Sequence, residues 1–169
     1  AWMESRLHEI IRDASAAMEE TQFRTASQLI FFELQGALKW YLKRCHNHPQ
    51  KTLMNHIIEA QLIMLSPFTP HMCEEMWETL GKKGFICEAQ WPVVNKQKIQ
   101  GDLEIQEEII KTVLGDVTNV LKLIKKQPQK ITLFVSVPWK YQLYRLVHMC
   151  METTKNPKVI IQQVMEDKD

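Results

Sequence analysis

Apolar residues recur at three- and four-residue steps along most of the chain, which is typical of helices that bury one face. The pattern predicts a helix over 7–18 and a second over about 22–44, with Thr21 as its N-cap. A third helix is predicted over 51–65, after a proline-containing linker. The first third of the chain therefore reads as consecutive helices joined by short turns.

The second predicted helix has the widest apolar face, so we expect it at the centre of a bundle. Its inward-facing residues are expected to be Ile30, Leu34, Ala37, Leu38, Tyr41 and Cys45, with Phe31, Trp40 and Leu42 broadening the face.

A corner is predicted after the third helix, because proline at position 67 cannot continue it. Thr69 is a suitable N-cap for the next helix, and Pro70 fits its first position, where a missing N–H costs nothing. Gly81 is expected to end that helix. Its buried edge is expected to consist of Cys73, Met76, Trp77 and Leu80.

The helical period lapses over 82–101, which predicts an irregular crossing loop pinned by Phe85, Ile86 and Trp91. A fifth helix, with Asp102 as its cap, is predicted to run to position 126.

The period then changes, and alternating apolar residues over 130–137 predict a strand. A helix is expected over 138–151, and another begins at Asn156-Pro157. The inward residues of the 138–151 helix are expected to be Trp139, Leu143, Leu146, Val147 and Cys150. The predicted fold is therefore mainly α, a helical bundle of about five helices followed by a small β-α-α extension. The predicted domains are a core bundle over 1–101, then the long helix and the start of a small α/β unit over 102–169.

Composition supports a helical protein, because 5 glycines and 7 prolines in 169 residues are too few for a turn-dense β fold. No stretch of about 18 apolar residues and no secretory signal occurs, so no membrane contact is expected. Four cysteines without a Cys-x-x-Cys pair, together with nine methionines, favour a reducing compartment and a cytoplasmic protein. Both ends fall in helical patterns, which suggests a piece of a longer chain.

Candidate chemistry is sparse. The segments Cys45-His46-Asn47-His48 and His71-Met72-Cys73 contain zinc-type ligands, but both cysteines fall on apolar helix faces. We therefore expect buried thiols beside surface histidines and no metal. The adjacent pairs Glu74-Glu75 and Glu107-Glu108 point about 100° apart on a helix and are expected to be solvated. No catalytic residue is predicted.

Charge is unevenly distributed although the net charge is only +1. Between positions 122 and 158 eight basic residues face a single acid, Glu152. On the second predicted helix Arg24, Gln28, Gln35 and Lys39 share a face, with Lys43 nearby. Such strips meet phosphates in nucleic-acid-binding proteins, or they are solvated helix faces.

Three segments, Met64–Trp77, Trp40–Arg44 and Ala89–Pro92, occur in an order that resembles the anticodon-binding domain of class Ia aminoacyl-tRNA synthetases. The helix, strand and Pro138-Trp139-Lys140 that follow are most like the archaeal and eukaryotic leucyl enzymes. A valyl, isoleucyl or methionyl relative is the alternative within this family.

The resemblance implies a bundle that binds leucine-type tRNA while a separate domain of the same, monomeric synthetase activates leucine with ATP and magnesium. Neither class I signature, His-Ile-Gly-His nor Lys-Met-Ser-Lys-Ser, occurs in this chain, so no catalysis and no cofactor are expected in it. Leucyl enzymes largely ignore the anticodon, which implies contacts to backbone and shape. The residues expected to bind tRNA are Arg24, Gln28, Lys39, Lys43, Lys122, Lys125, Lys126, Lys140 and Arg145.

Two other hypotheses remain open at this point. A structural bundle that braces other synthetase domains would carry exposed apolar patches. A zinc-bound domain would require stoichiometric metal.

Overall fold

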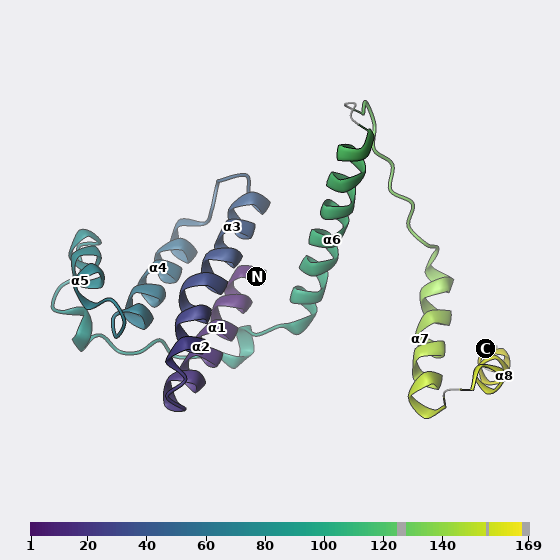
Figure 1. Ribbon diagram of the computed structural model, residues 1–169, viewed down its shortest axis with the longest axis horizontal. Coiled ribbons are helices and arrows are strands. Elements are labelled where there is room, and N and C mark those ends of the chain that lie inside the picture. Colours follow the sequence, from purple (N-terminus) through teal and green to yellow (C-terminus); the bar gives the residue numbers. More distant parts are fainter. Residues whose placement is uncertain (125–127, 155, 167–169) are drawn as a thin grey trace. The chain divides into compact units, whose positions relative to one another are not determined.

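Helices are the regular elements of the computed structural model, which describes residues 1–124, 128–154 and 156–166 (Figure 1). The mainly α fold is therefore confirmed. In chain order the elements are α1 (Trp2–Glu19), α2 (Phe23–Ser27), η1 (Gln28–Glu33), α3 (Leu34–Arg44), α4 (Lys51–Leu65), α5 (Pro70–Thr79), η2 (Ile86–Glu88), η3 (Lys96–Lys98), α6 (Gly101–Ile124), α7 (Pro138–Thr153) and α8 (Pro157–Glu166). The chain divides into two compact units, residues 1–120 and 121–169.

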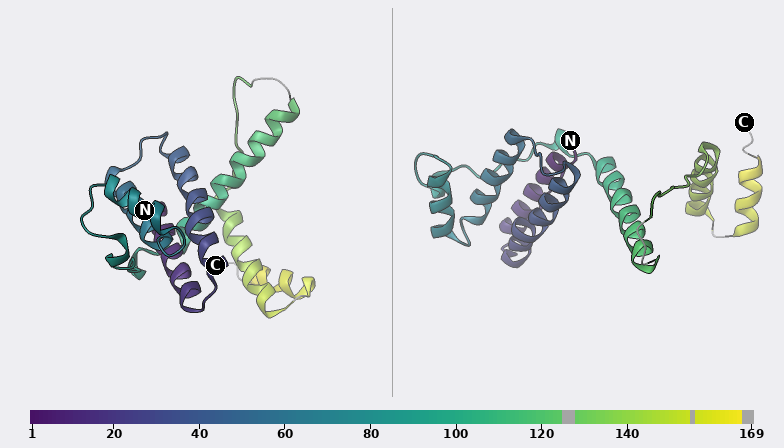
Figure 2. Two further views of the ribbon diagram at one scale, coloured as in Figure 1. Left: turned by 60° about the vertical axis from the view of Figure 1, so that its left-hand side comes forward. Right: turned by 90° about the horizontal axis from the view of Figure 1, so that it is seen from above.

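The core of the first unit lies where α1, the α2–η1–α3 helix and α4 pack side by side (Figures 1 and 2). Helix α1 contributes Leu7, Ile10 and Ile11, each almost fully buried. Ile30 and Leu34 of the central helix are fully buried against them. Burying such a side chain stabilises the fold by about 1.5–3 kcal/mol, so the apolar periodicity is the main cause of this arrangement.

The central helix is continuous from Phe23 to Arg44, as predicted, but it contains one π-helical turn, η1. A π-turn holds more residues than an α-turn, so positions after it rotate relative to an ideal helix. Phe31, which lies within this turn, is exposed, and the prediction that it broadens the buried face was wrong. The predicted cap was also wrong, because the N-cap is Gln22 and Thr21 has a positive φ of 59°.

A buried side-chain amide from another helix, α4, donates a hydrogen bond to the π-turn. Gln61 of α4 donates from Nε2 to the Ile30 carbonyl oxygen at 3.0 Å. Its Oε1 accepts a hydrogen bond from Nε2 of Gln35 at 3.3 Å. Gln35 therefore links two helices, and it is not part of a solvated strip.

The corner between α4 and α5 follows the sequence prediction. Helix α4 ends at Leu65, and α5 begins at Pro70 with Thr69 at the N-cap position. Cys73 and Trp77 form the buried edge of α5, whereas Met76 and Leu80, which were expected there, are exposed. Gly81 follows with φ 71°, a conformation that glycine adopts without steric cost.

The loop from 82 to 100 is fixed by polar groups of the helices as well as by apolar contacts. Both Glu74 carboxylate oxygens accept from the Ile86 backbone N–H, at 3.1 and 3.0 Å, so the expectation of a solvated Glu74 was wrong. Trp91 donates to Ser15 Oγ at 2.8 Å and packs on the core, as predicted. Phe85 is exposed and does not pin the loop.

Helix α6 is attached to the bundle by two tryptophan side chains. Trp2 Nε1 donates to Glu104 at 2.6 Å, and Trp40 Nε1 donates to Glu107 at 2.8 Å. Arg44 also pairs with Glu107, at 3.1 Å. Glu107 is thus a partner of the bundle and not the solvated residue that its position suggested.

In the second unit α7 packs against α8, and both helices begin at the predicted prolines. The predicted strand is wrong: residues 131–137 have irregular structure. A strand needs a second strand to pair with its backbone N–H and C=O groups, and the described residues contain none. The mainly α part of the fold prediction therefore holds, and the β-α-α extension does not.

Candidate nucleic-acid interface

The central helix presents three of the predicted contact residues to solvent. Arg24, Gln28 and Lys39 are exposed, and their side chains make no hydrogen bond or ion pair within the described parts of the chain. They are therefore available to an external anion. Gln35, which shares this face in an ideal helix, is occupied by Gln61.

Lys43, at the end of α3, lies in a different electrostatic environment. Its Nζ is 5.6 Å from the centre of the Trp40 ring, and Lys111 of α6 lies 5.7 Å from the same ring. The carboxylate of Glu107 is hydrogen-bonded to that indole. The quadrupole of an aromatic ring attracts a cation above its face. Lys43 is therefore partly engaged in a contact with Trp40 within the bundle.

Exposed aromatic rings adjoin Arg24 and Gln28. Phe23, Phe31 and Phe32 are all exposed, and the rings of Phe31 and Phe32 meet edge to face with centres 5.1 Å apart. The prediction from the sequence placed Phe31 on the buried face and so did not include this surface. It is an apolar patch beside a polar strip.

Cations and aromatic rings alternate on helix α7. Lys140 and Arg145, both predicted contacts, are exposed and unpaired with any carboxylate of the described residues. Lys140 Nζ lies 5.8 Å from the centre of the Trp139 ring. Trp139 is exposed and was wrongly expected to face inward, as was Leu143. The alternation is visible in the sequence as Trp139-Lys140-Tyr141 and Tyr144-Arg145.

Three of the predicted contact residues remain: Lys122, Lys125 and Lys126. Lys122 is exposed near the end of α6. Lys125 and Lys126 lie outside the described residues.

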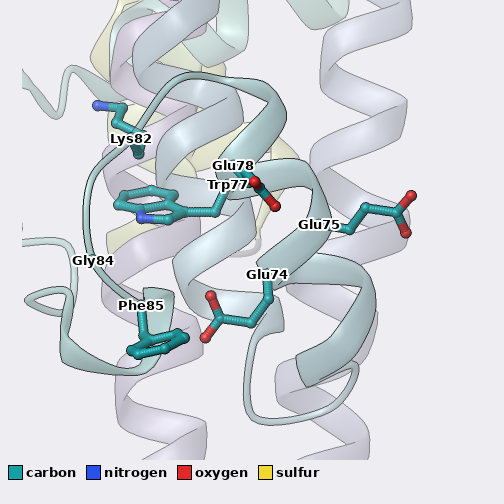
Figure 3. Close-up of a pocket in the computed structure, with 7 residues that line it drawn as sticks. All are labelled: Glu74, Glu75, Trp77, Glu78, Lys82, Gly84 and Phe85. Atoms are coloured by element: carbon teal, nitrogen blue, oxygen red, sulfur yellow. The ribbon is translucent and has the colours of Figure 1, made fainter.

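An acidic pocket of about 430 Å³ lies on a different surface, between α5 and the loop that follows it. Glu74, Glu75 and Glu78 line it together with Trp77, and Lys82 lies 5.3 Å from the centre of the Trp77 ring (Figure 3). The Glu74 carboxylate extends toward Phe85, whereas Glu75 points away from Trp77. Lys82 pairs with Glu59 at 2.7 Å, so the carboxylates of α5 are not neutralised by it. This surface repels phosphates.

The two cysteines considered as zinc ligands make contacts within the fold. Cys73 is buried, with Sγ 3.4 Å from Thr69 Oγ1, and the half-buried Cys45 contacts the Leu42 carbonyl at 3.5 Å. Among the described residues no three His, Cys, Asp or Glu side chains are grouped so that they could hold a metal ion. No helix in the same part of the chain has the length and apolar character needed to cross a membrane.

Residues 1–133 match a family model described as the anticodon-binding domain of tRNA ligase. The chain is also similar to curated leucine–tRNA ligases. It is 34% identical over 165 residues to that of Aeropyrum pernix and 38% identical over 168 residues to that of Methanococcus maripaludis strain C7. It is 35% identical over 169 residues to the enzyme of Methanosarcina barkeri. These alignments cover 98% or 99% of this chain and 17% of each relative, so the chain spans about one sixth of their length.

Proposed function

Because this chain belongs to the anticodon-binding domain family of tRNA ligases, we propose that it is the tRNA-binding module of a leucine–tRNA ligase. The module binds the phosphate backbone of leucine-type tRNA and positions it for a catalytic domain elsewhere in the protein. That domain binds ATP and magnesium and joins leucine to the tRNA. A monomeric enzyme in the cytoplasm remains a prediction from the sequence.

The observation that carries the proposal is the set of cations that the fold leaves unpaired. Arg24 and Lys39 on the central helix, and Lys140 and Arg145 on α7, are exposed without carboxylate partners among the described residues. Some other cations are neutralised within the fold, such as Lys98, which donates to Glu4 at 2.6 Å. Each lysine or arginine that neutralises a phosphate displaces counterions and contributes affinity.

The acidic pocket on α5 limits where tRNA binds. Its three glutamates disfavour a phosphate on that surface by like-charge repulsion. The tRNA therefore crosses surfaces that carry unpaired cations. Since phosphate contacts carry no sequence information, such a module contributes affinity and register.

The test is a charge reversal in the full-length synthetase. Lys140→Glu combined with Arg145→Glu is expected to weaken binding of a leucine tRNA transcript and to reduce the slope of log Kd against log salt by about 2. Lys83→Glu is the matched control, because Lys83 is exposed beside the acidic pocket and is expected to leave affinity unchanged. Unchanged affinity and slope in the double variant would contradict tRNA binding by α7.

The second candidate function is bracing of other domains, which the exposed Phe31 and Phe32 favour. Phe31→Ser with Phe32→Ser would then lower the thermal stability of the full-length enzyme while its tRNA affinity stays the same. A loss of tRNA affinity without loss of stability would instead favour a contact between this patch and the tRNA.

A further inference from the structure

Helix α7 has two distinct faces. The face that packs on α8 contains the half-buried Leu146, Val147 and Cys150, spaced as one stripe of a helix. Tyr141, Arg145 and His148 follow each other at three- and four-residue steps on the opposite face, and Tyr144 adjoins them. The packing of α7 in its own unit therefore leaves this second face free.

The free face consists of aromatic rings and cations. Tyr141 and Tyr144 are 49% and 69% exposed, and the ring centres of Tyr144 and His148 are 6.4 Å apart. Arg145 lies in this stripe, whereas Lys140 borders it, with its Nζ 5.8 Å from the centre of the Trp139 ring. The one carboxylate on α7, Glu152, lies at the far end of the face, 3.9 Å from His148 Nδ1.

We propose that the outer face of α7 is a stacking platform for unpaired nucleotides, on which Tyr141 and Tyr144 stack bases while Lys140 and Arg145 hold the flanking phosphates. This inference rests on the proposed tRNA-binding function and assigns a chemical role to residues that the charge argument does not include. Bases within a stem are already paired and stacked, so the nucleotides that reach the rings are unpaired. Stacking accepts any base, which suits a module that positions tRNA without reading its sequence.

The beginning of α7 supports the same assignment. Its N-cap, Val137, has no side chain able to cap the first turn, and Pro138 follows at the first helical position. Pro138 has no N–H and the Lys140 N–H donates to the Val137 carbonyl at 3.1 Å, so the Trp139 N–H and the positive end of the helix dipole remain to favour a phosphate. Lys140 and Tyr141 lie in this turn, so a phosphate there is next to both a cation and a ring.

A surface for a protein partner is the competing assignment, and the composition of the face argues against it. The free face carries no aliphatic side chain between Tyr141 and His148 in its stripe. The rings of tyrosine present flat π surfaces at a spacing of three residues, with unpaired cations beside them. Aromatic rings interleaved with cations are the arrangement that proteins use to bind single-stranded nucleic acid.

The experiment compares tyrosine variants of the full-length synthetase in their binding of a leucine tRNA transcript. Tyr141→Leu and Tyr144→Leu remove the π face but keep an apolar side chain of similar reach. Each is expected to raise Kd at least about fivefold, with the salt slope unchanged, because no phosphate contact is lost. Tyr141→Phe and Tyr144→Phe keep the ring and are expected to bind as the wild type does.

Met149→Ala is the matched control, because Met149 is an exposed aliphatic residue on the same helix and its loss is expected to leave Kd unchanged.

A second measurement uses only the wild-type enzyme, so it does not depend on whether a variant folds. 2-Aminopurine, placed in turn at the unpaired positions of the tRNA, is expected to lose fluorescence at one or two positions when the wild-type enzyme binds. The absence of quenching at every unpaired position would overturn the proposal.

The outcomes separate this inference from the proposed function. If the leucine variants bind normally while Lys140→Glu with Arg145→Glu weakens binding, stacking is wrong and tRNA binding by α7 stands. If neither set changes affinity, stacking and tRNA binding by α7 are both wrong. If the phenylalanine variants are as weak as the leucine variants, the hydroxyl groups make the contact, and stacking is again overturned.

Discussion

His8 is a titratable residue that lies in the core, with 3% of its surface exposed. Its Nδ1 accepts a hydrogen bond from the Asn95 backbone N–H at 3.3 Å, and Nε2 is buried without a partner in the described structure. Burial, followed by the charges of Lys98 and His56, lowers the pKa of His8 below 6.5, although Glu4 opposes this. The folded protein therefore disfavours the protonated imidazole relative to the unfolded chain.

A lowered histidine pKa makes stability depend on pH in a known direction. Above pH 6.5 the neutral imidazole is retained in both states, so its contribution to stability is fully present. Below that pH the unfolded chain binds a proton that the folded chain does not, and the free energy of unfolding falls by at most about 1.4 kcal/mol per pH unit. The loss continues until the pH passes the lowered pKa.

His8→Gln is therefore expected to make the urea midpoint of the 169-residue chain less dependent on pH between 7.5 and 5. The glutamine keeps an acceptor for the Asn95 N–H and removes the titration. His71→Gln, at an exposed position of α5, is the control and is expected to retain the wild-type slope. The hydrogen bond from Lys98 lowers the pKa of Glu4, whose window begins below 4.5 and stays outside this range. Equal slopes for His8→Gln and wild type would refute the assignment.

The π-turn is the feature that matters most at the scale of single elements. Phe31 and Phe32 within it are exposed, while Ile30 and Leu34 lie in the core. Within this turn, Gln61 supplies a side-chain donor to the Ile30 carbonyl. The side-chain amide of Gln61, on α4, thus helps to stabilise the neighbouring central helix.

Gln61→Leu is expected to destabilise the chain by about 1–3 kcal/mol, because the buried Ile30 carbonyl and Gln35 both lose their partner. Urea unfolding followed by far-ultraviolet circular dichroism measures the change. Gln28→Leu, an exposed position in the same π-turn, is expected to change the free energy of unfolding by less than about 0.5 kcal/mol. Similar effects at both positions would mean that the amide bond does not support the turn.

At the scale of the whole molecule, the described chain between α6 and α7 differs from the loops of the bundle. Residues 131–137 are exposed, and Phe134 is 96% exposed. In contrast, the 82–100 loop is tied to α1 through Trp91, Asn95 and Gln100. Exposed segments without backbone pairing are the first sites that proteases cut.

Limited digestion with chymotrypsin is therefore expected to cut first after Phe134 and to leave a resistant fragment that contains residues 1–134. Mass spectrometry identifies the cut. Phe134→Ser is expected to slow this cleavage at least several-fold, whereas Phe85→Ser, at an exposed position of the tied loop, is expected to leave it unchanged. First cleavage inside the bundle would show that the segment is protected.

The order of helices, the prolines that begin α5, α7 and α8 and the glycine after α5 were predictable from the sequence alone. The physical reason is that apolar periodicity, proline stereochemistry and glycine at positive φ act within a few residues. The sequence also identified the family and which cations were candidates for tRNA contact, because those features depend on residue type and order.

The tertiary structure alone decided which of those side chains are free and which are engaged in contacts within the protein. Glu74 and Glu107 look like surface acids in sequence, but partners 12 and 67 positions away bind them. Gln35 is not part of the exposed polar strip, because its side chain is hydrogen-bonded to Gln61 of another helix. The 131–137 segment shows the converse, since an alternating pattern specifies a strand only where a second strand completes its hydrogen bonds. Contacts between distant residues are set by packing, and a local pattern cannot contain them.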